Sequence, residues 1–221
     1  MHIEPGYVQP AKIAMANAGA ASLAVWVAKE QIKDWARAPW TFVKTGIAAL
    51  VFTVFMESFS MPVGPSELHF VGAMAMYLTL GFLPTLMGFA IGLGLQGLLF
   101  SPWDLVHLGV NSLSLMLPLL LVHFTIGKKF FDENLKHRIS FARILKLDAV
   151  YYGGVTTMVG FWLLVGGVET ALSSWLAFAA SYLAVVALEP VLTFAIVTGL
   201  KKVQDKRLVR NLFVVDKLTT R

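Results

Sequence analysis

Long apolar runs, separated by short polar stretches, alternate along the whole chain. Strands of a membrane barrel would alternate apolar and polar residues, and these runs do not. The run beginning at His69 is too long for one crossing, and the GFLP sequence at Gly81 to Pro84 breaks it in two. The pattern therefore predicts an all-α integral membrane protein, one transmembrane domain over residues 1–221, with about seven spanning helices. The predicted spans are residues 10–28, 40–56, 69–80, 84–100, 107–127, 148–167 and 174–200.

Lysine and arginine are unevenly distributed between alternate loops. They are concentrated after the first span, after the fifth span and in the tail 201–221, whereas segments 57–68, 101–107 and 168–173 contain neither. Cytoplasmic loops of membrane proteins carry the excess of positive charge. With an odd number of spans, this distribution predicts an N-terminus outside the cell and a basic tail, residues 201–221, in the cytoplasm.

The composition agrees with a membrane protein and narrows its chemistry. The chain is 57% hydrophobic and only 14% charged, and its mean hydropathy is +0.71, so it has too few charges for a soluble surface of its size. We expect a multi-pass protein of a bacterial or archaeal cytoplasmic membrane, in contact with lipid. The net charge of +5 is explained by the cytoplasmic loops, and no nucleic-acid partner is expected. Because cysteine is absent, a metal would need nitrogen or oxygen ligands.

The opening MHIEPGYVQP places a histidine directly after the first methionine. A free amine at Met1, the deprotonated backbone amide of His2 and the His2 imidazole would form two fused chelate rings. One further imidazole would complete a square-planar set of four nitrogens, which suits Ni(II) or Cu(II), and Co(II) less well. Residues 1–9 are therefore predicted to be a metal-binding segment, with the first span retained as a helix rather than cleaved as a signal peptide.

His69 is the candidate for the fourth nitrogen. It follows the loop SFSMPVGPSEL, whose prolines and glycine preclude regular helix. We expect this loop to be re-entrant and irregular, with His69 at the start of the third helix and at the floor of a cavity. Ser66 and Glu67 are near enough in sequence to hydrogen-bond an imidazole N–H. An interfacial histidine without metal is the alternative interpretation.

The remaining histidines are weaker candidates. His107 begins the fifth span beside Asp104, where it is an auxiliary ligand or entry residue, although an interfacial role is the favoured interpretation. His123 lies near the end of the same span and is expected to pack between helices. His137 lies in a basic loop and is expected to be solvated.

Four segments, MHIEPG, PSELHFVGA, QGLLFSPWDLVHLGVN and ALEPVLTFAIV, occur in an order that resembles the CbiM/NikM family. These proteins are the substrate-binding (S) membrane components of energy-coupling-factor transporters for cobalt and nickel. The resemblance implies metal ligation by Met1, His2 and His69 through the same four nitrogens. It also implies a supporting role for Asn111 and a structural role for Glu189.

The chain departs from the family pattern in three places. PSELH replaces a small-residue run before the loop histidine. Pro5 falls one position later than the usual proline, and Ser114 stands where a second asparagine is common. These departures bear on the metal preference and on the coupling to an ATPase module.

The leading hypothesis is a component that captures Ni(II) or Co(II) as transported substrate, with Cu(II) also compatible, and delivers it inward. Its partners would be a transmembrane T component and ATPase subunits, since the chain has no phosphate-binding G-x-x-x-x-G-K-[ST] motif. A stand-alone metal permease or channel is the alternative. An intramembrane enzyme is a remote one, because no H-E-x-x-H or G-x-S-x-G motif is present. No cofactor is expected. Metal occupancy is expected to fall as the pH drops through about 6, near the ordinary histidine pKa.

Overall fold

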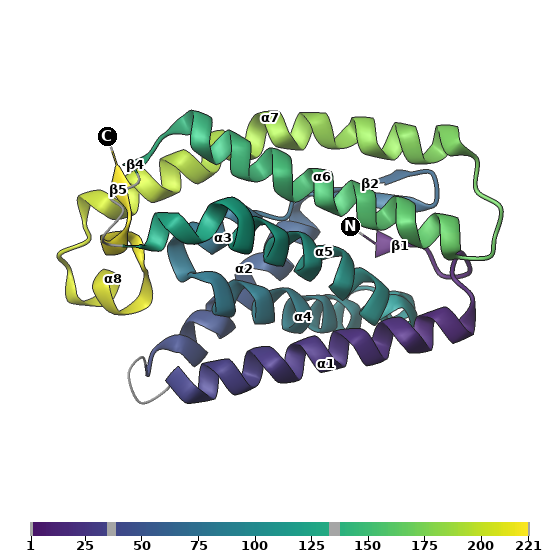
Figure 1. Cartoon of the computed structure of the whole chain (residues 1–221), viewed down its shortest axis with the longest axis horizontal. Helices are drawn as coiled ribbons and strands as arrows, with labels where there is room; N and C mark the ends of the chain where they lie inside the picture. Colours follow the sequence, from purple (N-terminus) through teal and green to yellow (C-terminus); the bar gives the residue numbers. More distant parts are fainter. Residues whose placement is uncertain (1, 35–38, 133–137, 221) are drawn as a thin grey trace.

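A computed structural model describes residues 2–34, 39–132 and 138–220. Its longer helices run side by side along the long axis of the molecule (Figure 1). They are α1 (Pro10–Asp34), α2 (Thr41–Ser58), α4 (Phe82–Leu99), α5 (Leu108–Val122), α6 (Phe141–Val165) and α7 (Leu172–Lys202). A 3₁₀ segment, Pro102–His107, leads into α5, and a π segment, His123–Gly127, and a second 3₁₀ segment, Lys128–Phe131, follow it. The all-helical character predicted from the apolar runs is confirmed.

Within the described residues, five helical segments are long and apolar enough to cross a membrane. They are Pro10–Lys33, Thr41–Ser58, Phe82–Leu99, Pro102–Phe131 and Leu172–Lys202. Helix α6 has 25 residues but carries Arg143, Lys146 and Asp148 near its start, and it is not among these five. The chain is a multi-pass membrane protein, with five candidate spans by length and composition; the predicted number of seven spans is not confirmed.

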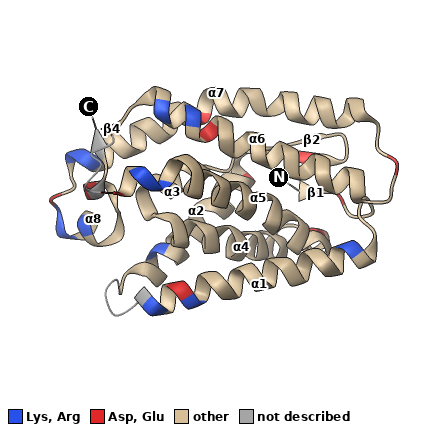
Figure 2. Ribbon diagram, viewed as in Figure 1, with Lys and Arg blue, Asp and Glu red and all other residues tan. Residues whose placement is uncertain are grey.

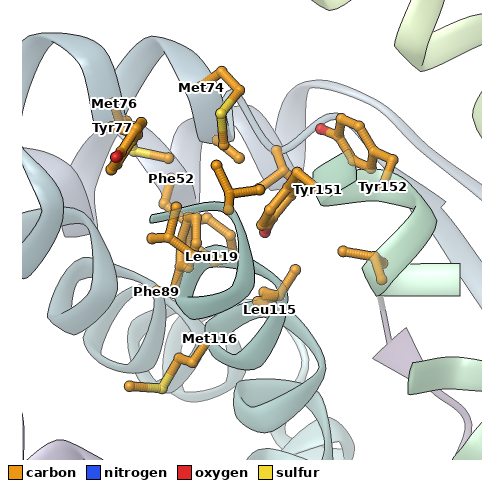
Figure 3. Close-up of a cluster of buried hydrophobic side chains, with 14 of the residues drawn as sticks. Phe52, Met74, Met76, Tyr77, Phe89, Leu115, Met116, Leu119, Tyr151 and Tyr152 are labelled. Carbon is orange, nitrogen blue, oxygen red and sulfur yellow. The ribbon is translucent and has the colours of Figure 1, made fainter. Parts of the chain in front are cut away.

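The short helix α3 (Ala73–Leu80) forms the centre of the bundle. All eight of its residues are buried, and it packs against α2, α4, α6 and α7. Figure 3 shows its Met74, Met76 and Tyr77 among buried side chains of the surrounding helices. At about 1.5 Å per residue, eight residues reach about 12 Å, less than half the hydrocarbon thickness. The third predicted span is therefore a buried core helix.

Residues 60–69 form a β-hairpin rather than the irregular re-entrant loop expected from the sequence. Strand β2 (Ser60–Val63) pairs antiparallel with β3 (Ser66–His69), and Gly64 lies in the connecting turn at φ +63°. Pro62 is compatible with this pairing because β2 is an edge strand of a sheet ordered β1-β3-β2. Pro62 and Gly64 therefore fit a regular hairpin, the first on an edge strand and the second in the turn.

His69 is the last residue of β3, so the expectation that it begins a helix is wrong. The chain turns into α3 at Gly72, whose φ of +66° favours glycine. A Cβ at Gly72 would also collide with the ring of Phe55. The helix therefore begins only after this turn, and His69 is positioned by strand pairing.

Lysines and arginines gather at one end of the bundle. Figure 2 shows most of them near α8 (Arg207–Leu212) and the adjoining helix ends, with an isolated one at the far end of α1. The same end holds a parallel pair of short strands, β4 (Arg138–Ile139) and β5 (Thr219–Thr220), and the 3₁₀ segment Val215–Lys217. The strands that carry His2 and His69 lie in the other half of the molecule (Figure 1). The basic end and the histidine strands are thus separated along the bundle.

Candidate metal centre

A two-residue strand at the start of the chain brings His2 to the hairpin. Strand β1 (His2–Ile3) pairs antiparallel with β3, with His2 opposite Glu67 and Ile3 opposite Ser66. The next residue extends the pairing, because the N–H of Glu4 donates to the carbonyl of Pro65 at 3.1 Å. Residues more than sixty positions apart therefore meet at one end of the sheet.

The backbone of β1 is also held from the side of α5. The N–H of Ile3 donates to Oδ1 of Asn111 at 3.0 Å, and the carbonyl of Ile3 accepts from Nδ1 of His107 at 2.8 Å. The hydroxyl of Ser66 donates to the carbonyl of His2 at 2.6 Å. The three side chains in these bonds are all buried. These hydrogen bonds go to the backbone of His2 and Ile3, not to the His2 imidazole. They thus hold His2 in position through the side chains of Asn111, His107 and Ser66.

Three donor atoms converge beside β1 and β3. Nδ1 of His2 lies 3.2 Å from Nε2 of His69, and Oε2 of Glu67 lies 2.9 Å from the same Nε2. Nδ1 of His2 and Oε2 of Glu67 are 3.7 Å apart. Among the described residues, these three form a group whose ligand atoms all lie within 4.8 Å of one another. This group could hold a metal ion through two nitrogens and one oxygen.

The two histidine nitrogens are spaced as neighbouring ligands of one metal ion. With metal–nitrogen bonds of about 2.0 to 2.1 Å, two ligands at a right angle lie about 2.8 to 3.0 Å apart. The observed 3.2 Å between His2 Nδ1 and His69 Nε2 needs only a small adjustment to reach that spacing.

A backbone carbonyl sets the tautomer of His69. Its Nδ1 lies 3.0 Å from the carbonyl oxygen of Met56, and a carbonyl can only accept, so Nδ1 carries the hydrogen. In the neutral ring, Nε2 then has the free lone pair, and it is Nε2 that faces His2 and Glu67. A hydrogen bond at the far nitrogen commonly orients a metal-binding imidazole in this way.

Burial keeps both imidazoles uncharged at neutral pH. Removal from solvent is the main cause that lowers the pKa of His2 to about 3, and the same cause lowers the pKa of His69. An imidazole binds metal only in its neutral form. Neither ring therefore needs to lose a proton to bind a metal near neutral pH.

The structure also shows where two of the other predicted histidines lie. His107 is fully buried against β1 rather than interfacial, and its ring stays out of the three-donor group. His123 packs between helices as expected, since it stacks on Phe82 at 3.7 Å and its Nδ1 lies 2.9 Å from the hydroxyl of Tyr77. Met1 and His137 lie outside the described residues.

Comparison with known proteins identifies the family. The family model CbiM, described as a cobalt uptake substrate-specific transmembrane region, matches residues 2–207. The chain belongs to the CbiM family. It is a transmembrane component for the uptake of cobalt or another transition metal.

A solved structure has the same fold as this CbiM-family chain. It is described as a transition metal transporter and superimposes with a TM-score of 0.73 at 20% sequence identity, covering 95% of this chain and 96% of its own. No curated protein matches the sequence.

Two parts of this CbiM-family site were not predicted from the sequence. The carbonyl of Met56 orients His69, and a backbone atom leaves no signal in the residue pattern. The carboxylate of Asp104 lies 3.8 Å from Nδ1 of His2; its position beside His107 in an outer loop was noted, but its approach to His2 depends on how β1 inserts.

Replacing Asn111 with leucine should weaken metal binding about 10- to 100-fold, the range found when a partner that orients a ligand is lost. The expected cause is that the N–H of Ile3 loses its acceptor, so His2 is no longer held in place. Isothermal titration of the purified protein measures the affinity. Ser114→Ala, one turn along the same helix, is the matched control, because the Ser114 hydroxyl donates to the carbonyl of Val110 in its own helix. Equal losses in both variants would contradict a role for Asn111.

Proposed function

We propose that this CbiM-family chain binds Ni(II) or Co(II) as transported substrate at the centre formed by His2 and His69. The observation that carries the proposal is the convergence of His2 Nδ1 and His69 Nε2 at 3.2 Å. Both rings are buried and the second is held in the tautomer that leaves its facing nitrogen free. Cu(II) fits the same nitrogen donors.

The proposed ligand set includes the amine of Met1 and the backbone nitrogen of His2. It requires that Met1 is the first residue of the mature chain and that its amine is unmodified. The position of His2 supports this set, because β1 holds the residue next to Met1 directly beside His69. The two backbone nitrogens and the His2 ring would then form the fused chelate, and His69 would supply the fourth nitrogen.

Selective loss of binding in histidine variants tests the proposal. His2→Ala and His69→Ala should each lower the affinity for Ni(II) and Co(II) by more than ~100-fold. Loss of a residue that only orients a ligand costs up to ~100-fold, and loss of a ligand itself should cost more. His123→Ala is the matched control, because His123 is a half-buried histidine that packs on Phe82, away from the donor group. Metal titrations of the three purified variants would refute the proposal if His69→Ala bound as tightly as His123→Ala.

We further propose that the chain acts as the S component of an energy-coupling-factor transporter, rather than as an enzyme or a stand-alone permease. Family membership supports this, as does the absence of a phosphate-binding motif in the sequence. The proposed orientation places the basic end of the bundle in the cytoplasm and the histidine strands outside, following the charge distribution in Figure 2.

Reconstitution separates the S-component role from a stand-alone permease. The purified chain in liposomes should bind metal but accumulate none. Uptake against a gradient should appear only when a T component and ATPase subunits are added together with ATP. Accumulation of Ni(II) or Co(II) by the chain alone would instead support the permease.

A further inference from the structure

The carboxylate of Glu67 faces Nε2 of His69, the ring nitrogen that would bind a metal ion. An orienting carboxylate accepts a hydrogen from the imidazole nitrogen that does not bind the metal. In His69 that nitrogen is Nδ1, and its hydrogen is already donated to the carbonyl of Met56. The carboxylate oxygen Oε2 of Glu67 is instead 2.9 Å from Nε2, the nitrogen with the free lone pair. Glu67 therefore does not occupy the place of an orienting partner.

The same oxygen is not an orienting partner of His2 either. It lies 3.7 Å from His2 Nδ1, which is beyond hydrogen-bond distance, and Nδ1 is the nitrogen that faces His69. A carboxylate oxygen and the Nε2 lone pair repel each other unless a positive charge lies between them. The convergence of these atoms is thus favourable for a bound cation.

The three separations fit one metal ion. Sides of 2.9, 3.2 and 3.7 Å make a triangle whose corners all lie about 1.9 Å from a common point. Metal bonds to imidazole nitrogen and carboxylate oxygen are about 2.0 to 2.2 Å long. An ion slightly out of the plane of the triangle is therefore at bonding distance from all three atoms without any change in the fold.

We propose that Glu67 is a direct oxygen ligand of the transported metal, the fifth ligand beside the four nitrogens. This inference rests on the proposed function and specifies the metal preference of the same centre. Four nitrogens in a plane satisfy Ni(II), whereas Co(II) and Cu(II) accept an additional oxygen ligand. Glu67 therefore shifts the preference of the centre away from Ni(II) and toward Co(II).

Glu67→Gln tests this role, because it keeps the size of the side chain and removes the charged donor. Glu4→Gln is the matched control: it removes the same charge from a carboxylate that interacts with Glu67, yet Glu4 is outside the three-donor group. Competition titrations with Co(II) and Ni(II), and the electron paramagnetic resonance spectrum of the Co(II)-loaded protein, are measured for both variants and the unchanged chain.

Glu67→Gln is expected to lower the affinity for Co(II) about tenfold more than that for Ni(II) and to alter the Co(II) spectrum. Glu4→Gln should change neither the affinity ratio nor the spectrum. Equal losses for the two metals with an unchanged spectrum would overturn the inference while leaving the proposed function intact. Failure of the unchanged chain to bind either metal would overturn the proposed function, and this inference with it.

Discussion

Extending the chain by a few residues before Met1 should reduce the affinity for Ni(II) and Co(II) by more than ~100-fold, which is the upper end of the loss caused by removing a residue that only orients a ligand. The extension converts the amine of Met1 into a peptide nitrogen and moves the free amine away from His2. One corner of the fused chelate is then lost, although His2 and His69 remain. Equilibrium metal titration of the purified protein measures the effect.

A removable extension supplies the control. Cleavage that leaves Met1 as the first residue should restore the affinity in the same protein preparation, which excludes misfolding as the cause. An extension of equal length at the C-terminus, at the opposite, basic end of the bundle, should have no effect. Tight binding by the N-terminally extended protein would eliminate the amine as a ligand and leave the side chains of His2, Glu67 and His69.

Metal affinity should fall about 100-fold per pH unit below pH 7, or about 10⁴-fold between about pH 7 and about pH 5. Two protons are released on binding: one from the amine, whose ordinary pKa is about 7.7 to 8.0, and one from the backbone nitrogen of His2. Burial lowers the pKa of His2 to about 3, so that ring is already neutral and adds no proton in this range. Burial also lowers the pKa of His69, so this ring takes up a proton only at a lower pH than an ordinary histidine does.

This expectation replaces the one drawn from the sequence, in which ordinary histidines would be protonated below about pH 6. Calorimetric titrations in buffers with different ionisation enthalpies give the number of protons released at each pH. A value of one would remove the backbone nitrogen of His2 from the ligand set. A value rising to four between pH 7 and pH 5 would show that burial does not keep the His2 ring neutral.

The sequence was informative about the long helices and about which histidines matter. Apolar runs predicted about seven spans, and five segments of the structure are long and apolar enough to cross a membrane, because a hydrocarbon environment constrains length and composition strongly. The position of His2 after Met1, and of His69 after a segment that cannot be helical, identified the two rings that the structure brings together. Their role as metal ligands, with Met1, stays a prediction.

The errors concern contacts between distant segments. A two-residue strand such as β1 has no recognisable alternation, so its pairing with β3 could not be predicted. Without that pairing, His107 looked like an interfacial residue, whereas it is buried because it bonds to the carbonyl of Ile3. The short α3 looked like a membrane span because a fully buried core helix is also apolar on every side.

The shifted proline has a kinetic consequence. In the family pattern proline stands at residue 4, where it has no N–H to donate. Here proline is at residue 5, and the N–H of Glu4 bonds to the carbonyl of Pro65. One additional hydrogen bond contributes about 0.5 to 1.5 kcal/mol, so the N-terminal segment should detach from the hairpin about two- to tenfold more slowly. A longer dwell time of the segment would slow both the entry of a metal ion and its release from the site.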